Sequence, residues 1–448
     1  MGRLAIAVAM LAIVVTACGS RRTDSPAGDR DGGARADASS IDDSGSPLPD
    51  ASFADAGRDA GPRDAGTIII PDVCEDTGLE PGPVISAGVG VLEAEPHVAV
   101  SSSGDVVAVW ISEPLHVAYS VSHNRGSTWT SPAILDTGEM RAGDPTVAVD
   151  STGAFYAAWM EMTGTVPDVV SHVFVARLAP GSSAFGVPVE ASDPSARYFL
   201  DKPWVLVDNR DAVLVTWFNA SRFALVVGRS TDGGASFARF DAAMISGLAY
   251  PCIDREGGAG APIYVVYHDD TGEAIGLAKS TDGGTSWSVP SRSIPGDRAA
   301  GEDSTCVVHG EDLWLAYARG AGDTVRVIHS PNGGATYDRV VDAAIAPTGS
   351  LALLPQLVRT ASGTLDLIYY RGAIGGAARV TRSSSTDGGE TWRCSDLGAA
   401  GMTAFTRDSA LWWGDYLGVS ATDGALYIAH SDNSSGFGHI RFLTIPDP

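Results

Sequence analysis

The sequence predicts an all-β protein whose folded part is a seven-bladed β-propeller. Three observations lead to this prediction. The chain has 53 glycines and 25 prolines among 448 residues, an excess that indicates many turns between short strands. A pair of short strands returns seven times, and an eight-residue turn motif returns five times, at steps near 50 residues or twice that. Repeats of about 50 residues with several short strands each are typical of propeller blades.

The N-terminal residues 1–18 read as an export signal. An apolar run extends from Leu4 to Val15, which is too short for a membrane span of about 20 residues. The run ends in V-T-A-C, which resembles the lipobox of bacterial lipoproteins. The resemblance implies cleavage before Cys18, lipid on its sulfur, and attachment to the bacterial cell envelope, at the outer membrane or cell surface. The alternative is an ordinary signal peptide with a chance cysteine.

Residues 19–72 consist of Asp, Ala, Gly, Arg, Ser and Pro, with Phe53 as their only aromatic residue. So little apolar area cannot offset the conformational entropy of the chain, and we expect a disordered stalk. The propeller is expected over residues 73–448.

The repeat consists of seven units. Each unit begins with a short strand, and a second strand with alternating apolar and polar residues follows within the unit. The first strands follow Glu95, Asp144, Lys202, Tyr250, Ser304, Leu354 and Gly414, and the second strands lie at Val106–Trp110, Phe155–Trp159, Ala212–Trp217, Ile263–Tyr267, Leu313–Tyr317, Leu365–Tyr369 and Leu426–His430. The seventh unit ends with its third strand, at His439–Ile445. Because Pro83–Ser86 resembles Pro132–Leu135, the strand after the first turn motif, we expect it to supply the missing fourth strand and close the ring.

The turn motif has the form S-x-(D/N)-x-G-x-(S/T)-aromatic. Its central acid or amide can accept backbone hydrogen bonds, its glycine permits positive φ, and its aromatic ring can pack beneath the turn. The central residues are Asn124, Asp232, Asp282, Asn332 and Asp387. The motif resembles the Asp-box, or bacterial neuraminidase repeat, of sialidase-like propellers. These five residues are expected to be structural, between the third and fourth strands.

The resemblance covers residues 83–448 and implies the architecture more strongly than an activity. Sialidases of this superfamily are usually six-bladed, which is the alternative fold. They carry an Arg triad, a Tyr–Glu nucleophile pair and an Asp acid, and the first Arg lies in an R-I-P-like motif on the first inner strand. That strand here reads E-A-E-P-H-V-A-V from Glu93, without Arg. We therefore favour a binding or scaffolding module for an extracellular glycan or protein; the alternative is an exo-sialidase-like glycoside hydrolase or lyase.

The loops that enter the innermost strands should converge at one mouth of the central channel. Candidate ligand-binding residues there are Glu95, Asp144, Arg197, Tyr198, Asp201, Tyr250, Glu302, Asp303, Trp413 and Asp415. Such a mixture of carboxylates, Arg and aromatic rings suits a sugar or a peptide. Two alternatives remain open: the charged groups cap strands and pair with neighbouring Arg, or the carboxylates hold Ca²⁺.

The chemistry of other partners is constrained by charge and motif. A net charge of −24 disfavours nucleic acid, which needs a basic patch. No zinc-type spacing such as H-E-x-x-H and no phosphate-binding loop appears, so no cofactor other than Ca²⁺ is considered. Only the lipid anchor is expected to contact a membrane, and we expect a monomer.

Five cysteines remain to be placed. With Cys18 lipidated, four are left in an exported chain, where disulfides persist. Cys252 and Cys306 occupy the same place in units four and five. Cys394 follows the turn motif of unit six, and Cys74 precedes the closing strand of the neighbouring unit. We therefore predict the pairs Cys252–Cys306 and Cys74–Cys394.

Overall fold

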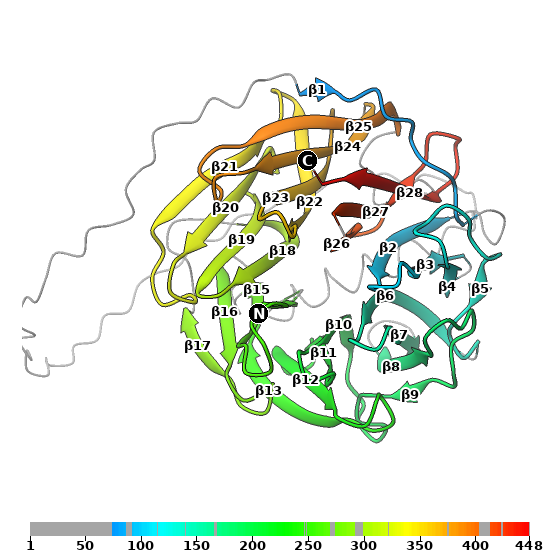
Figure 1. Ribbon diagram of the computed structural model, residues 1–448. Coiled ribbons are helices and arrows are strands. Elements are labelled where there is room, and N and C mark those ends of the chain that lie inside the picture. The colour runs from blue at the N-terminus through cyan, green and yellow to red at the C-terminus, as the bar shows by residue number, and fades with distance from the viewer. Residues whose placement is uncertain are drawn as a thin grey trace, which may run out of the picture.

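The computed structural model describes most of the chain from Cys74 onward (Figure 1). The described residues are 74–86, 92–113, 115–138, 140–164, 168–245, 247, 249–268, 274–291, 299–320, 322–373, 376–402, 413–422 and 424–447. The expected signal peptide, Cys18 and the expected stalk lie outside them. Within these ranges the chain forms strands and no helices, so no helix there could cross a bilayer.

Four consecutive four-stranded antiparallel sheets form blades one to four. Blade one contains β2 (Glu93–Val100), β3 (Val106–Ser112), β4 (His116–Ser122) and β5 (Ala133–Ile134); blade two contains β6 (Arg141–Val149), β7 (Phe155–Thr163), β8 (Val170–Leu178) and β9 (Val189–Glu190). Blade three contains β10 (Leu200–Val207), β11 (Val213–Asn219), β12 (Ala224–Ser230) and β13 (Ala238–Met244); blade four contains β14 (Ala249–Ile253), β15 (Ile263–His268), β16 (Ile275–Ser280) and β17 (Ser288–Ser291).

Three further sheets complete the ring. Blade five contains β18 (Ala299–His309), β19 (Asp312–Arg319), β20 (Thr324–Ser330) and β21 (Arg339–Ile345); blade six contains β22 (Ser350–Arg359), β23 (Leu365–Ala373), β24 (Ala378–Ser385) and β25 (Arg393–Met402); blade seven contains β26 (Gly418–Thr422), β27 (Ala425–Asp432) and β28 (His439–Pro446). The first strand of each blade contacts the first strands of both neighbouring blades, from β2 round to β26 and back. The seven-bladed prediction is confirmed, and the six-bladed alternative is wrong.

The core lies between the blades. The second strand of most blades carries a large aromatic residue in its second half, and these side chains are almost completely buried: Trp110, Trp159, Trp217, Tyr267, Tyr317 and Tyr369. Strand alternation explains this placement, because every other side chain of a middle strand faces the adjacent blade. Each blade is therefore held by the apolar faces of its two neighbours.

The predicted closing segment completes blade seven. Val84 forms an antiparallel bridge with Arg441 of β28. The backbone N–H of Ile85 donates to the Ile440 carbonyl at 2.9 Å, and the backbone N–H of Phe442 donates to the Pro83 carbonyl at 3.1 Å. The two ends of the propeller are thus joined in one sheet, as the truncated seventh unit predicts.

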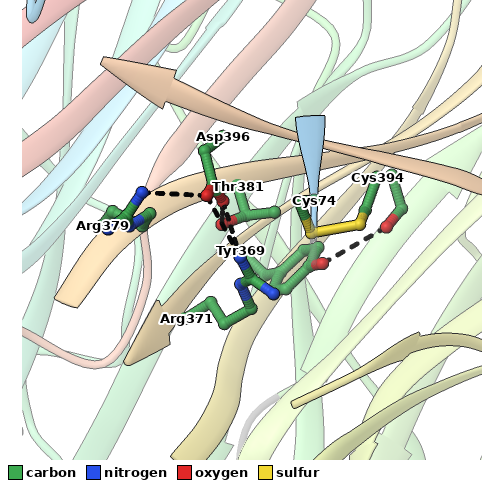
Figure 2. The surroundings of a disulfide bond; sticks show 8 residues. Cys74, Tyr369, Arg371, Arg379, Thr381, Cys394 and Asp396 are labelled. Atoms are coloured by element: carbon green, nitrogen blue, oxygen red, sulfur yellow. Dashed lines mark hydrogen bonds and ion pairs between the residues drawn. A yellow bond between two sulfur atoms is a disulfide. The ribbon is translucent and has the colours of Figure 1, made fainter. Parts of the chain in front are cut away.

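Both predicted disulfides are present. Cys252 on β14 pairs with Cys306 on β18 across a Cα–Cα distance of 5.9 Å, and Cys74 pairs with Cys394 on β25 across 4.9 Å. Directly after Cys74 lies a short strand that the sequence did not predict, β1 (Glu75–Asp76). It pairs parallel to β25 as a fifth strand of blade six. Figure 2 shows the Cys74–Cys394 disulfide beside Asp396 and its hydrogen-bond donors, among them Arg371 and Arg379.

The five turn motifs lie between the third and fourth strands of their blades. In the motif of blade six, the Ser385 hydroxyl donates to Asp387 Oδ1 at 2.7 Å and accepts from the backbone N–H of Gly389 at 2.8 Å. Asp387 accepts from the backbone N–H of Thr391 at 2.9 Å and from its hydroxyl at 2.5 Å. The Trp392 indole closes the turn on the Gly389 carbonyl at 3.2 Å. The central Asp or Asn side chains of these motifs stabilise the turns and do not line the channel.

Candidate functional site

A repeated β-bulge shapes the start of several innermost strands. In blades one, two, three and six, the residue before a proline has positive φ: 53° at Glu95, 53° at Asp144, 50° at Lys202 and 57° at Leu354. Strand pairing shifts register at each of these positions. A bulge re-aims the side chain at the extra residue, and positive φ is uncommon for residues other than glycine. The repeat therefore turns three charged side chains in the same way in three consecutive blades.

These charged side chains meet at one point. Lys202 Nζ donates to Glu95 Oε1 at 3.0 Å, to Asp144 Oδ1 at 3.0 Å and to Asp415 Oδ2 at 2.8 Å. Asp415 precedes β26 and directly follows Gly414, which occupies the corresponding position of blade seven. The cluster, which we call the Lys202 network, thus unites blades seven, one, two and three.

The Lys202 network is shielded from water. The exposed fraction of the side chain is 7% for Lys202, 0% for Glu95, 8% for Asp144 and 16% for Asp415. The backbone N–H of Asp415 also donates to Glu95 Oε1 at 3.1 Å. The preceding residue is Gly414, with φ of 95°, and any side chain there would collide with Glu95. A glycine is therefore required for blade seven to approach this closely.

Burial and neighbouring charges shift the pKa values of the network residues in different directions. Desolvation raises the pKa of Glu95 well above its ordinary value, and the nearby Lys202 charge only partly opposes it. Desolvation acts on Asp144 as well, but the Lys202 charge and hydrogen bonds from its neighbours outweigh it and lower the pKa. For Lys202, desolvation is outweighed by the surrounding carboxylates, which raise the pKa well above its ordinary value. Glu95 is therefore the carboxyl group of the network that binds a proton most readily, beside the Lys202 ammonium and the Asp144 carboxylate.

Aromatic rings form a second layer around the network. The Tyr416 hydroxyl donates to the Pro145 carbonyl at 2.9 Å, and its ring centroid lies 5.9 Å from Lys202 Nζ. Trp204 packs against Tyr416 at 5.2 Å and against Tyr250 at 4.6 Å between ring centroids. These rings exclude water from one side of the charged groups, which strengthens the electrostatic interactions among them.

The structure brings together only some of the predicted ligand-binding residues. Glu95, Asp144 and Asp415 belong to the Lys202 network. Asp201 lies next to it, where its Oδ1 accepts the backbone N–H of Lys202 at 3.0 Å. Tyr250 reaches it only through Trp204.

The remaining candidates lie elsewhere. The Trp413 ring is buried against Tyr370, at 4.8 Å between ring centroids. Its contact with Glu95 is through the backbone: the Trp413 carbonyl accepts the backbone N–H of Glu95. Arg197 is exposed, and Tyr198 is 37% exposed. Glu302 and Asp303 belong to β18, but their side chains lie outside the described part of the structure.

Sequence reasoning missed Lys202, the central residue of the site. A signal was present: Lys202 occupies the same position before proline as Glu95 and Asp144, in the motifs K-P-W, E-P-H and D-P-T. It is also one of only two lysines in the chain, with Lys279. Equivalent positions of neighbouring blades lie close together in space. A lysine at the position that is acidic in the two preceding repeats therefore predicts an ion pair.

The arrangement bears on the Ca²⁺ alternative. Among the described residues, no group of three or more His, Cys, Asp or Glu side chains is arranged to hold a metal ion. At the place where the carboxylates converge, the Lys202 ammonium donates to three of them. The charge that a cation would supply there is supplied by the protein itself.

Comparisons with known proteins identify structures with a similar fold. No family model and no curated protein matches the sequence. An ulvan lyase from a new polysaccharide lyase family has a similar structure, with 13% identity, a TM-score of 0.51, and coverage of 85% of this chain and 96% of that one. The ulvan lyase bound to a GlcA–Rha3S unit gives 0.52. A Hadza microbial sialidase is 16% identical over 82% of this chain and 68% of its own, with a TM-score of 0.48. At 13% identity the likeness to the ulvan lyase shows a shared fold only.

Proposed function

We propose that the protein is a lipoprotein of the bacterial cell envelope whose propeller binds or scaffolds an extracellular glycan or protein. One observation carries this proposal, the Lys202 network. The charged groups at the convergence of four blades are engaged with one another and hidden from water. The five turn motifs, read as Asp-boxes, fit a sialidase-like propeller whose first inner strand lacks the expected arginine.

The protonation states support binding over turnover. A general base must be able to accept a proton and a general acid must be able to release one near the working pH. The raised pKa of Lys202 keeps its amine charged, and the lowered pKa of Asp144 keeps its carboxylate ionised. Neither group is therefore suited to exchange a proton with a substrate at every turnover.

The ligand would meet the partly exposed rim around the network. Asp415 keeps 16% of its side chain exposed and Tyr250 is half-buried. Arg197 and Tyr198, just before β10, lie outside the network and are exposed, and we propose that they contact the same ligand from there. A carboxylate, a guanidinium and aromatic faces are the groups that give directional contacts to sugars and peptides.

A glycan array with the mature protein, scored for binding and for released product on the same glycans, tests this function. We expect binding without product. Asp415→Asn should weaken binding by more than its loss of an ion pair to Lys202 lowers the melting temperature, whereas Glu390→Gln, an exposed carboxylate on a turn motif, should leave binding unchanged. A loss of binding that accompanies an equal loss of melting temperature would mean that Asp415 is structural.

A sialidase-like hydrolase or a lyase is the second candidate, because one observation favours it. The raised pKa of Glu95 favours its protonated form, which is the form that a general acid requires. Its side chain is 0% exposed, so a substrate would have to displace part of the network. Product formation that disappears in Glu95→Gln would establish this candidate and reject the binding module.

The lipid anchor is a separate part of the proposal. It rests on V-T-A-C at Val15–Cys18 and on the composition of residues 19–72. Cys18→Ser should prevent lipidation and leave the protein soluble or uncleaved. Membrane partition of that variant after cleavage at the normal position would refute the anchor.

A further inference from the structure

The choice of lysine at position 202 is unusual for this chain. The protein has 30 basic residues besides its histidines, of which only Lys202 and Lys279 are lysines. Two other buried ion pairs in the described part of the chain use arginine: Arg382 with Asp366 at 2.6 Å and Arg371 with Asp396 at 3.0 Å. Arginine matches a carboxylate better than lysine does, but a guanidinium cannot be deprotonated. A primary amine can become a nucleophile, so lysine at the most enclosed ion pair points to chemistry beyond charge pairing.

Three groups of the network stand in mutual contact. Lys202 Nζ lies 3.0 Å from Asp144 Oδ1 and 3.0 Å from Glu95 Oε1. The Glu95 and Asp144 carboxyl groups both contact the Lys202 nitrogen and interact electrostatically with each other, so that the three groups form a triangle. Glu95 Oε2 is buried and has no hydrogen-bond partner among the described residues. An amine, a carboxyl group and a second, protonated carboxyl group are therefore held together away from water.

The backbone holds this triangle in place before any reaction. All three residues have φ near 50°, each followed by a proline. Residues in this region cost about 1 kcal/mol or more each and are kept where surrounding structure fixes them. Leu354 shares the conformation without a charge, so the bulge belongs to the architecture and the three side chains make use of it.

We propose that Lys202 and Asp144 join through an intramolecular amide bond, with Glu95 as the proton-transfer residue. The cross-link would connect the innermost strands of blades two and three, β6 and β10. Lysine and aspartate side chains are the substrates, water is the only product, and no oxidant or cofactor is needed.

The reaction balances as follows. The Lys202 ammonium passes a proton to the Asp144 carboxylate, which gives a neutral amine and a neutral acid. The amine nitrogen attacks Asp144 Cγ, and a C–N bond forms. Glu95 donates its proton to the departing hydroxyl, the C–O bond breaks, and water leaves. Glu95 then takes a proton from the amide nitrogen and returns to its starting state.

Proximity and burial favour this step. Groups held at about 3–3.5 Å in the reacting geometry gain effective concentrations far above those in solution. The starting ion pair carries two buried charges that are costly to desolvate, and the neutral amide removes both. The reaction occurs once in the life of each molecule, so the slow proton transfer within the ion pair does not prevent it.

Asp144 is the partner that the contacts select. It contacts the same Lys202 nitrogen as Glu95 and is 8% exposed, whereas Asp415 is 16% exposed and therefore nearer to water that would reverse the reaction. Asp415 instead neutralises charge on Lys202 from the side of blade seven.

Peptide mass mapping of the mature full-length protein tests the proposal. After reduction, denaturation and chymotrypsin digestion, we expect peptides containing Asp144 and Lys202 to appear joined and lighter by one water than their sum. An amine-reactive label applied under the same denaturing conditions should modify Lys279 and not Lys202. Unlinked peptides with a labelled Lys202, or a link to Asp415 or Glu95, would overturn the assignment.

Variants separate the cross-link from simple ion pairing. Glu95→Gln should slow cross-linking by about 100-fold or more, as expected for the loss of proton transfer. Lys202→Arg keeps a cation but cannot form the bond, and Lys279→Arg is the matched control that should cross-link fully. Complete cross-linking in Glu95→Gln would reject the role of Glu95, and the wild-type mapping decides the bond whether or not a variant folds.

Discussion

Cys252 and Cys306 occupy equivalent positions on the innermost strands of blades four and five and are joined by a disulfide with a Cα–Cα distance of 5.9 Å. Neighbouring inner strands of the ring therefore approach closely enough for a covalent bridge. Both residues lie in the apolar cluster between these blades, with Tyr264, Leu277 and Leu315. The disulfide is a covalent link across an interface that apolar packing already stabilises.

Removal of this disulfide should lower stability without changing the architecture. The bond spans 54 residues, and the chain-entropy model gives such a loop about 4 kcal/mol of stabilisation. We expect Cys252→Ala with Cys306→Ala to lower the free energy of unfolding by about 2–4 kcal/mol, measured by denaturant titration. An unchanged midpoint would show that packing alone holds blades four and five together.

The second disulfide should contribute more. Cys74 and Cys394 are separated by 320 residues, and the same model gives the longer loop about 1.5 kcal/mol more than the shorter one. The bond also fixes β1 against β25, just before the closing segment. Cys74→Ser with Cys394→Ser should therefore destabilise more than the first pair of substitutions and should speed protease cleavage within residues 75–86. Equal destabilisation by both pairs, with no added cleavage, would contradict this order.

The turn motifs should tolerate asparagine in place of aspartate. In blade one, Asn124 Oδ1 accepts the Thr128 backbone N–H at 2.8 Å, and its Nδ2 donates to the Thr128 hydroxyl at 2.8 Å. In blade six, Asp387 instead accepts from the hydroxyl of Thr391. The hydroxyl can act in either direction, so the hydrogen bond survives with reversed polarity.

We therefore expect Asp387→Asn to cost less than about 1 kcal/mol in the free energy of unfolding, and Asp387→Ala to cost more. Burial would raise the pKa of Asp387, but hydrogen bonds from Thr391, Ser385 and Glu390 outweigh it and lower the value to about 2. The charged form thus stabilises the turn above the ordinary pKa near 4, and this contribution is lost as pH falls toward 2. Asp387→Asn should lose that acid dependence; an equal cost for both substitutions would contradict the reversed hydrogen bond.

Sequence repetition made the ring predictable, because a repeat carries positional equivalence. Cys252 and Cys306 stand third in their motifs, and that equivalence placed them on neighbouring strands. The same reasoning extended to Pro83–Ser86, which matches Pro132–Leu135 and closes the last blade. The short β1 has only two residues and follows no repeat, so nothing in its sequence indicated that it pairs with β25.

The site was less predictable, because side-chain direction depends on backbone conformation that residue identity does not reveal. The positive φ at Lys202 turns its amine toward Glu95 and Asp144. Trp413 shows the converse: it was expected at the channel mouth, yet its ring packs in the core against Tyr370 and leaves only a backbone carbonyl near Glu95. Residues shared by one loop can therefore face opposite ways.

The seam between blades seven and one contains a carboxyl group that should make stability depend on pH. Glu93 begins β2 and is fully buried, and the Ser86 hydroxyl of the closing segment donates to its Oε2. Ser86 Oγ also accepts the backbone N–H of Ile440 on β28 at 2.8 Å, and His439 Nδ1 lies 3.6 Å from Glu93 Oε2. Burial raises the pKa of Glu93 to about 7, although the hydrogen bond from Ser86 partly opposes the shift.

A raised pKa means that the folded state binds the proton more tightly than the unfolded state does. The stabilisation is complete below the ordinary pKa of about 4.5 and is lost as pH rises through about 7. We expect the free energy of unfolding to fall by roughly 2–3 kcal/mol between pH 4.5 and 8 from this group. Glu93→Gln should remove that slope, because its amide stays neutral throughout, whereas Glu390→Gln should keep it. His439→Gln separates the neighbouring titration: if the slope vanishes there and persists in Glu93→Gln, the imidazole and not the carboxyl controls the seam.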